Sequence, residues 1–446
     1  MRIFVAGATG VLGWRTVREL VAAGHDVTGI ARSEEKAAQL RALGAKPVRV
    51  DLFDADAVRD AVAGHDAVLN LATHVPPVSE ATRRSAWAEH ERIRSEGSRI
   101  LVDAAIAAGA KTYVQESLAF AYADGGDRWL DEDSPLMDGG AATAVKAAEA
   151  ETARFTASGG RGVALRFGQF YAPDSSHTEA IVGLARRGVS MYVGGADGYA
   201  PHISCEDAAR AVVAALDAPA GVYNVVDDEP MTRREADAAL ASAVGSKKLL
   251  RAPATAVKAA GEDAKIFLQS NRVSNARFRE VTGWAPRDAS VRDGFRSLAR
   301  AMPGEHTPLL QTMALAILAL SALGLGVYAT FFPRAFFDDF PTGRGWVAAD
   351  GPFNEHLVRD FGALNLGLGF VALLAAIVGG RWLVIAAGGS SVLFGLPHLV
   401  YHLRHLEHYE GFDKAANVVS LGGAVVLGLV VLALSVRSSG MTTERR

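Results

Sequence analysis

The sequence predicts a protein of two parts, a doubly wound α/β domain over residues 1–300 and an all-α domain of four transmembrane helices over residues 309–436. Two observations predict this fold class. Residues 1–300 alternate short apolar runs with charged, alanine-rich stretches of helical pattern, which is typical of a parallel sheet covered by helices. After Pro308 the composition changes sharply into four long segments without formal charge. Residues 301–308 are therefore expected to be a linker, and residues 437–446 a tail.

The overall composition excludes several classes of protein. Hydrophobic residues make up 50% of the 446 residues and charged residues 21%, so the chain is neither disordered nor of low complexity. A net charge of −3 provides no electrostatic basis for binding nucleic acid. The single cysteine, Cys205, excludes an internal disulfide framework and a multi-cysteine zinc site. The first residues lack the long apolar core of a secretory signal, so we expect the front domain to stay in the cytoplasm.

The first predicted strand, Arg2–Ala6, runs directly into a glycine-rich loop, and a helical pattern then extends to Ala23. Glycines at this spacing permit a tight turn, a close approach of a pyrophosphate to backbone N–H groups, and close packing of the helix on the strand. The N-terminus of the helix presents its partial positive charge to the phosphates. The pattern therefore predicts a dinucleotide-binding loop with the contact residues Gly7, Thr9, Gly10, Val11, Leu12 and Gly13.

Three further predicted strands end beside the same site. The second strand, Val27–Ala31, is followed by Arg32. An acidic residue near this point accepts the ribose 2′-OH of NAD, whereas an arginine meets the 2′-phosphate of NADP. Arg32 therefore favours NADP(H) over NAD(H), although an ordinary exposed arginine fits the same pattern. The third and fourth strands, Pro47–Val50 and Ala67–Leu71, lead into the pairs Asp51-Leu52 and Ala72-Thr73.

These segments resemble the extended short-chain dehydrogenase/reductase superfamily, and within it the NAD-dependent epimerase/dehydratase family. Further matches follow in the family's order: Asn70-Leu71-Ala72, the helix Gly97–Ala108, Leu165–Pro173, His202–Ala209 and Gly221–Val225. The resemblance implies an NAD(P)-binding Rossmann domain whose substrate lobe covers residues 170–300. It also implies that Asp51 and Leu52 lie near the adenine. Ala72 is then expected near the nicotinamide-side ribose, with Leu71 and Thr73 beside it.

The family's catalytic residues are only partly present. The family uses a Tyr-x-x-x-Lys pair on one helix together with a serine or threonine at the end of the fifth strand. Residues four apart share a helical face, so the lysine holds the cofactor ribose and lowers the pKa of the tyrosine that exchanges a proton with the substrate. Here Lys146 is retained, but Ala142 stands in the tyrosine position and Leu118 in the serine position. An alanine donates no proton, and a leucine forms no hydrogen bond.

Two neighbouring residues, Ser117 and Tyr122, are candidate substitutes for the missing catalytic groups. Tyr171 and His74 are further candidates, and each of the four also fits a structural role. Losing a general acid costs about 10²–10⁴ in rate, so hydride transfer without one remains open.

Four successive segments are long and apolar enough to cross a lipid bilayer, which requires about 20 residues of helix. They are Leu309–Phe332, Phe361–Gly380, Trp382–Leu403 and Ala415–Val436. A buried soluble bundle would interleave polar faces, which these segments lack. The spans broadly resemble those of DoxX-like membrane proteins, without a specific motif.

Basic residues predict the orientation of these spans. They precede the first span, occupy the turn between the second and third, and follow the last: Arg292, Arg296, Arg300, Arg381, Arg437, Arg445 and Arg446. The positive-inside rule therefore predicts a multi-pass protein of the plasma membrane with both termini in the cytoplasm. The opposite loops also carry basic residues, but acidic ones accompany them.

Three histidines at the end of the third span, His398, His402 and His405, share a helical face by their i, i+4, i+7 spacing. This spacing suits a metal or haem site, or contact with a quinone. Histidines that simply mark the solvated end of a span fit the pattern equally.

Three hypotheses for function follow. The first is a membrane-anchored NAD(P)-dependent enzyme that acts on a small carbonyl or a sugar nucleotide. The second is a non-catalytic NADP(H) sensor or membrane-assembly factor, because Ala142 replaces the family's tyrosine. The third is a transporter or a quinone-linked electron-transfer protein. The expected partners are a small-molecule substrate, the lipid bilayer, and either a second copy of the chain or another membrane protein.

Overall fold

The computed structural model describes residues 1–74, 84–139, 141–253, 266–302 and 309–440. The chain divides into two compact units, Met1–Pro303 and Gly304–Arg446. Residues 303–308 of the predicted linker and residues 441–446 of the predicted tail lie outside the described residues.

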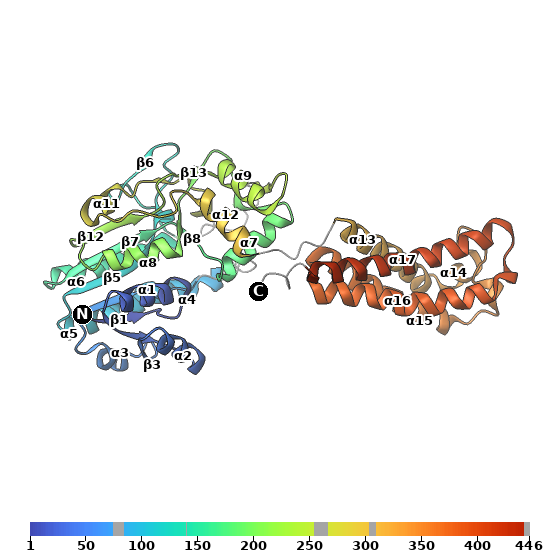
Figure 1. Cartoon of the computed structure of the whole chain (residues 1–446), viewed down its shortest axis with the longest axis horizontal. Helices are drawn as coiled ribbons and strands as arrows, with labels where there is room; N and C mark the ends of the chain where they lie inside the picture. The colour runs from blue at the N-terminus through green and yellow to red at the C-terminus, as the bar shows by residue number, and fades with distance from the viewer. Residues whose placement is uncertain (75–83, 140, 254–265, 303–308, 441–446) are drawn as a thin grey trace. The chain divides into compact units, whose positions relative to one another are not determined.

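A seven-stranded parallel sheet forms the centre of the first unit (Figure 1), which confirms the doubly wound α/β class. Its strands stand in the order β12-β7-β5-β4-β1-β2-β3. Their bounds are β1 Arg2–Ala6, β2 Asp26–Ile30, β3 Lys46–Val48, β4 Ala67–Asn70, β5 Thr112–Leu118, β7 Arg161–Phe167 and β12 Gly221–Val225. The strand order reverses between β1 and β4, so the ligand crevice of such a sheet lies at the carboxyl ends of these two strands.

Helices cover both faces of this sheet because successive strand residues point to opposite sides. Ile3 and Val5 of β1 join one core with α1, α2 and α8, whereas Phe4 joins a second core with α3, α5 and α6. The helices are α1 Val11–Ala22, α2 Glu34–Ala42, α3 Ala55–Val62, α4 Ala88–Arg92, α5 Ser98–Ala107, α6 Ala141–Ala157 and α8 Cys205–Ala214.

A smaller lobe with its own core follows β7. Ile181, Leu240 and Phe295 are buried together in this core, which joins α7, α9 and α12. These helices are α7 Ser176–Arg186, α9 Arg233–Val244 and α12 Val291–Ala301, and α11 Ala276–Thr282 packs near β12. Short strands complete the unit: β6 Trp129–Leu130, β8 Gln169–Tyr171, β9 Val189–Val193, β10 Tyr199–Ala200, β11 His202–Ser204, β13 Met231–Thr232, β14 Leu250–Ala252 and β15 Arg272–Val273.

The described part of the second unit is helical. Its helices are α13 Leu309–Phe331, α14 Pro333–Asp339, α15 Glu355–Val378, α16 Arg381–Arg404 and α17 Gly411–Gly440. Four of them, α13, α15, α16 and α17, are long and apolar enough to cross a membrane. These four helices overlap the four predicted spans, although α13 ends one residue and α15 two residues before the predicted span ends.

The outer surface of the second unit is apolar. Leu320, Leu393 and Val419 are 72%, 78% and 71% exposed, values that suit contact with lipid rather than water. Inside the bundle, small residues bring helices together. A Cβ added at Gly326 of α13 would lie 2.7 Å from the backbone nitrogen of Leu366 on α15, so the two backbones touch.

A candidate dinucleotide-binding site at the carboxyl edge of the sheet

Only glycine fits the two ends of the loop between β1 and α1. Gly7 has φ +78°, and a Cβ on it would lie 2.5 Å from the carbonyl carbon of Leu71 at the end of β4. A Cβ on Gly13 would lie 1.9 Å from the carbonyl oxygen of Gly7. The loop is therefore pressed against both β4 and its own helix, as a dinucleotide-binding turn requires.

The N-terminus of α1 is open toward solvent. Gly10 is its exposed N-cap residue, no side chain caps the helix, and its first turn contains no acidic residue. The free N–H groups of the first turn, around Val11 and Leu12, are available to an anion, and the helix dipole favours one. Thr9, half-buried, completes this phosphate-binding end.

The end of β2 presents an unpaired cation. Arg32 is exposed and, among the residues that the structure describes, has no hydrogen-bond or ion-pair partner. The next residue, Ser33, instead caps α2 and accepts a hydrogen bond from the backbone N–H of Lys36 at 3.3 Å. Arg32 thus retains its donors for a phosphate.

Of the residues predicted after β3 and β4, Leu71 and Ala72 border the glycine loop. Asp51 is exposed and accepts a hydrogen bond from the backbone N–H of Phe53, while Leu52 packs against Gly97. Leu71 contacts Gly7 through its backbone. The backbone N–H of Ala72 donates to Asn70 Oδ1 at 3.3 Å.

A buried ion pair between Arg94 and Glu116 is linked through His90 to the Thr73-His74 segment. This arrangement was not predicted from the sequence. Arg94 forms an ion pair with Glu116 of β5 and donates from Nε to His90 Nε2 at 3.0 Å. His90 therefore carries its proton on Nδ1, which lies 3.1 Å from the carbonyl oxygen of His74 and 3.4 Å from Thr73 Oγ1. Burial, together with the Arg94 charge, lowers the pKa of His90 to about 3, so the ring is neutral. The i, i+4 spacing of His90 and Arg94 is the only local signal.

The predicted catalytic substitutes are engaged inside the protein. Ser117 is buried and donates to Glu149 Oε1 of α6 at 2.7 Å. The Tyr122 hydroxyl is buried as well, where it donates to Asn224 and accepts from Arg166, both at 2.8 Å. Burial raises the pKa of Tyr122 to about 12.

Arg166 joins these groups into one network. It pairs with Glu149 at 2.7 Å, and its backbone neighbours across the sheet are Ser117 and Asn224. Three adjacent strands thus contribute polar side chains to one buried cluster, which accounts for Ser117 and Tyr122 structurally. The strand register that aligns them was not readable from the sequence.

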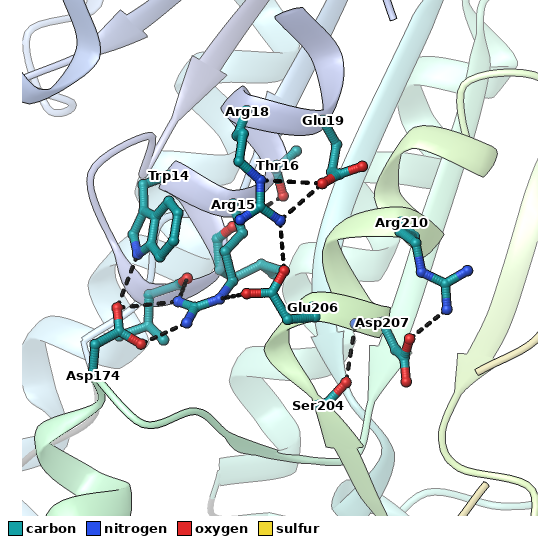
Figure 2. Close-up of polar contacts among 12 residues, drawn as sticks. Trp14, Arg15, Thr16, Arg18, Glu19, Asp174, Ser204, Glu206, Asp207 and Arg210 are labelled. Atoms are coloured by element: carbon teal, nitrogen blue, oxygen red, sulfur yellow. Dashed lines mark hydrogen bonds and ion pairs between the residues drawn. The ribbon is translucent and has the colours of Figure 1, made fainter. Parts of the chain in front are cut away.

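A second network ties α1 to the smaller lobe (Figure 2). Arg15 is buried and pairs with Asp174, after β8, at 2.6 Å and with Glu206, at the start of α8, at 2.7 Å. Trp14 Nε1 also donates to Asp174 at 3.1 Å. Burial alone would raise the pKa of Asp174, but hydrogen bonds from Arg15 outweigh it and hold this pKa below its usual value. Arg15 therefore fixes the cofactor-binding helix against the lobe.

Comparison with known proteins agrees with this geometry. Residues 7–219 match the family profile described as NAD(P)H-binding. A 3-diazoavenalumate denitrifying reductase of Streptomyces is 35% identical over 314 residues, which cover 66% of this chain and 99% of that protein. The chain belongs to this NAD(P)-binding family of short-chain dehydrogenase/reductases. An epimerase family protein of Mycobacterium bovis is 31% identical over 265 residues, with 58% of this chain and 84% of that protein covered.

Solved structures share the fold of this family member. A human epimerase family protein with NADPH superposes with a TM-score of 0.57 at 24% identity, covering 67% of this chain and 99% of that one. UDP-glucose 4-epimerase of Thermus thermophilus with NAD has a TM-score of 0.56 at 24% identity, covering 68% of this chain and 100% of that one. The first unit is thus an NAD(P)H-binding domain, and the predicted cofactor class is confirmed.

The residue at the position expected for the family's tyrosine is buried in this member. Ala142 is 1% exposed and packs with Leu118 and Val145 in a closed apolar cluster. Lys146, one turn later, is exposed and pairs with Asp138 at 3.2 Å. A proton donor is therefore absent from the position where the family has one.

Of the three histidines predicted to share a helical face, two lie together and the third makes a separate contact. The rings of His398 and His402 lie 4.8 Å apart, and His402 Nδ1 is 3.3 Å from the Tyr409 hydroxyl. His405 instead donates to the carbonyl oxygen of Tyr401 and stacks on its ring. Within the described ranges, no group of three or more His, Cys, Asp or Glu side chains is placed to hold a metal ion.

Proposed function

We propose that the chain is a membrane-anchored NADPH-dependent reductase of small electron-poor molecules. The observation that carries this proposal is the glycine loop between β1 and α1, which leaves an open helix N-terminus for a diphosphate. The similarity to a reductase over 99% of that protein's length supports reduction as the direction of the reaction. Arg32, which follows β2 and has no partner within the described parts of the chain, supports NADPH over NADH.

The buried apolar cluster around Ala142 supports reduction rather than sugar-nucleotide epimerisation as the reaction. Oxidising a sugar hydroxyl requires a base that removes its proton, and the buried Ala142–Leu118 cluster contains none. A bound reduced nicotinamide supplies a hydride to an electron-poor carbon or heteroatom of an acceptor. Solvent water supplies any proton that the product needs. Within this reaction, the residues of the chain orient the two reactants: Lys146 and the Ala72 segment at the ribose, and the Arg15 network between helix and lobe.

The proposed location is the plasma membrane, with both termini in the cytoplasm. Four apolar helices and the basic residues that flank them, Arg292, Arg296, Arg300, Arg381 and Arg437, support this topology.

Titration of the detergent-purified chain with NADPH and NADH, followed by fluorescence, tests cofactor binding. We expect tighter binding of NADPH. Absorbance at the nicotinamide band then tests turnover with aldehydes, quinones and electron-poor aromatic acceptors, and we expect at least one of these to oxidise NADPH. Absence of binding to either nucleotide in folded protein would contradict the proposal.

A second candidate function is a non-catalytic NADP(H) sensor. The closed Ala142–Leu118 cluster and the engagement of Lys146 by Asp138 favour it, because both remove groups that the family uses in proton transfer. Tight NADPH binding without oxidation by any acceptor would support the sensor over the reductase.

A further inference from the structure

The ends of three segments meet on one side of the smaller lobe, where the chain leaves the first unit. Arg186, at the end of α7, donates to the carbonyl oxygen of Met302 after α12. The segment that follows α9 is hydrogen-bonded to the end of α7. Ser246 donates to the carbonyl oxygen of Ala185 at 2.9 Å, and the backbone N–H of Leu250 donates to the carbonyl oxygen of Gly188 at 2.7 Å. Figure 1 shows α7, α9 and α12 gathered in this lobe.

This surface is rich in exposed basic side chains. Arg187, Lys247 and Lys248 are exposed on the segments that follow α7 and α9. The outward face of α12 adds Arg292, Arg296 and Arg300. Among the described residues of α12, the acidic side chain is Asp293, which pairs with Arg296 at 2.9 Å. Arg187 has an interaction partner and Arg292 lies near Glu235, so the excess of positive charge on this surface comes from Lys247, Lys248 and Arg300.

Two apolar side chains project from the same surface. Leu250 of β14 is 70% exposed and pairs in register with Val189 of β9, which is 40% exposed. Basic residues near helix C-termini complement the helix dipole, but that effect does not explain an exposed leucine two residues after a pair of lysines. Apolar side chains among basic ones are the combination that favours an anionic lipid surface.

The first apolar helix follows this surface closely in the sequence. Only residues 303–308 separate Met302 from Leu309, where the first apolar helix begins.

We propose that this surface, made of Arg187, Val189, Lys247, Lys248, Leu250 and the basic face of α12, docks on anionic phospholipid headgroups. The choice of the cytoplasmic leaflet rests on the proposed function; the docking itself does not. Docking holds the first unit against the bilayer, so a substrate that partitions into lipid reaches it without crossing bulk water.

The single cysteine makes a direct test possible, because Cys205 is 1% exposed and does not compete for a thiol-reactive dye. The full chain with Leu250→Cys carries an environment-sensitive fluorophore in nanodiscs of phosphatidylcholine, with or without about 30% phosphatidylglycerol. We expect a blue shift only in the anionic discs, reversed at about 0.5 M salt because screening then acts within a few ångströms. A label at Val281→Cys, on α11 and 40% exposed, is expected not to shift.

Charge reversal completes the test. Arg187→Glu, Lys247→Glu and Lys248→Glu together are expected to abolish the shift, since each basic residue contributes a factor of about five to binding an anionic surface. The matched control reverses Arg59, Arg99 and Lys111, which are exposed around α3 and α5. A shift that is equal in neutral discs, survives the first reversal, or occurs only in discs with two copies of the chain would overturn the proposal. NADPH titration of the same samples tests the proposed function separately.

Discussion

The two ends of the cofactor site differ in a way that separates binding from proton transfer. At the phosphate end, the glycines have no side chains to block access to the backbone, and the N-terminus of α1 faces solvent without a capping side chain. At the corner where the family has its tyrosine, Ala142 and Leu118 close an apolar cluster, and Ser117 and Tyr122 bond to buried partners. On the proposed assignment of the site, the chain retains the loop that nucleotide binding requires and has an apolar side chain in the place of the usual acid. Four experiments test this contrast.

The largest expected effect is at the open end. Gly13→Ala introduces a Cβ 1.9 Å from the carbonyl oxygen of Gly7, so either the loop or α1 must move. We expect NADPH affinity to fall by at least about 100-fold, since the backbone N–H groups lose their alignment with the phosphates. The matched control is Gly183→Ala in α7, where a Cβ meets nothing within 4 Å. Unchanged affinity in the Gly13 variant would contradict the proposed binding loop.

At the closed end, Ala142→Tyr is expected to destabilise the protein rather than restore a catalytic residue. A phenol ring has no room beside Leu118 and Val145, and overpacking of this kind costs about 1–3 kcal/mol. The melting temperature should fall and NADPH oxidation should not rise. Combining Ala142→Tyr with Leu118→Ser should recover part of the lost stability. An increase in turnover in the single variant would indicate that this corner opens to substrate.

The discrimination between the two nucleotides is expected to depend on Arg32. Hydrogen bonds to charged groups are worth about 1.5–3 kcal/mol, so Arg32→Ala should weaken NADPH binding at least about 10-fold. NADH affinity should change little because NADH lacks the 2′-phosphate. Arg41→Ala, in the last turn of α2 and bonded to Glu34, serves as the control. Equal losses of affinity for NADPH and NADH would mean that Arg32 does not contact the 2′-phosphate.

The smallest expected effect is a pH dependence from His90, which lies beside Thr73 and His74. Its pKa is lowered to about 3 in the folded protein, so the folded state binds a proton less readily than the unfolded chain. The stability from this group is therefore full above pH 6.5 and declines as pH falls, by about 1 kcal/mol between pH 7 and 5.5. His90→Gln should flatten that slope in urea unfolding of residues 1–302, which belong to the first compact unit. An unchanged slope would exclude His90 as its source.

Local patterns were sufficient to predict much of the fold. The glycine loop lies within seven consecutive residues, and the four spans are continuous apolar segments, so neither depends on distant partners. Strand ends were displaced by one or two residues; the third strand, for example, is Lys46–Val48 rather than Pro47–Val50. Such shifts arise because hydrogen bonds to neighbouring strands, rather than side-chain patterns, decide where a strand ends.

The sequence by itself determined the order of the elements, the glycine loop proposed to bind a diphosphate, the alanine at the position expected for the family's tyrosine, and the four apolar helices. The tertiary structure alone decided which polar side chains meet. Arg15 lies 159 residues from Asp174, and Ser117 lies 32 residues from Glu149. Likewise, His405 turns toward Tyr401 instead of joining His398 and His402. The physical reason is that periodicity reports which face of an element is buried, whereas the partner on that face is set by strand order, register and packing.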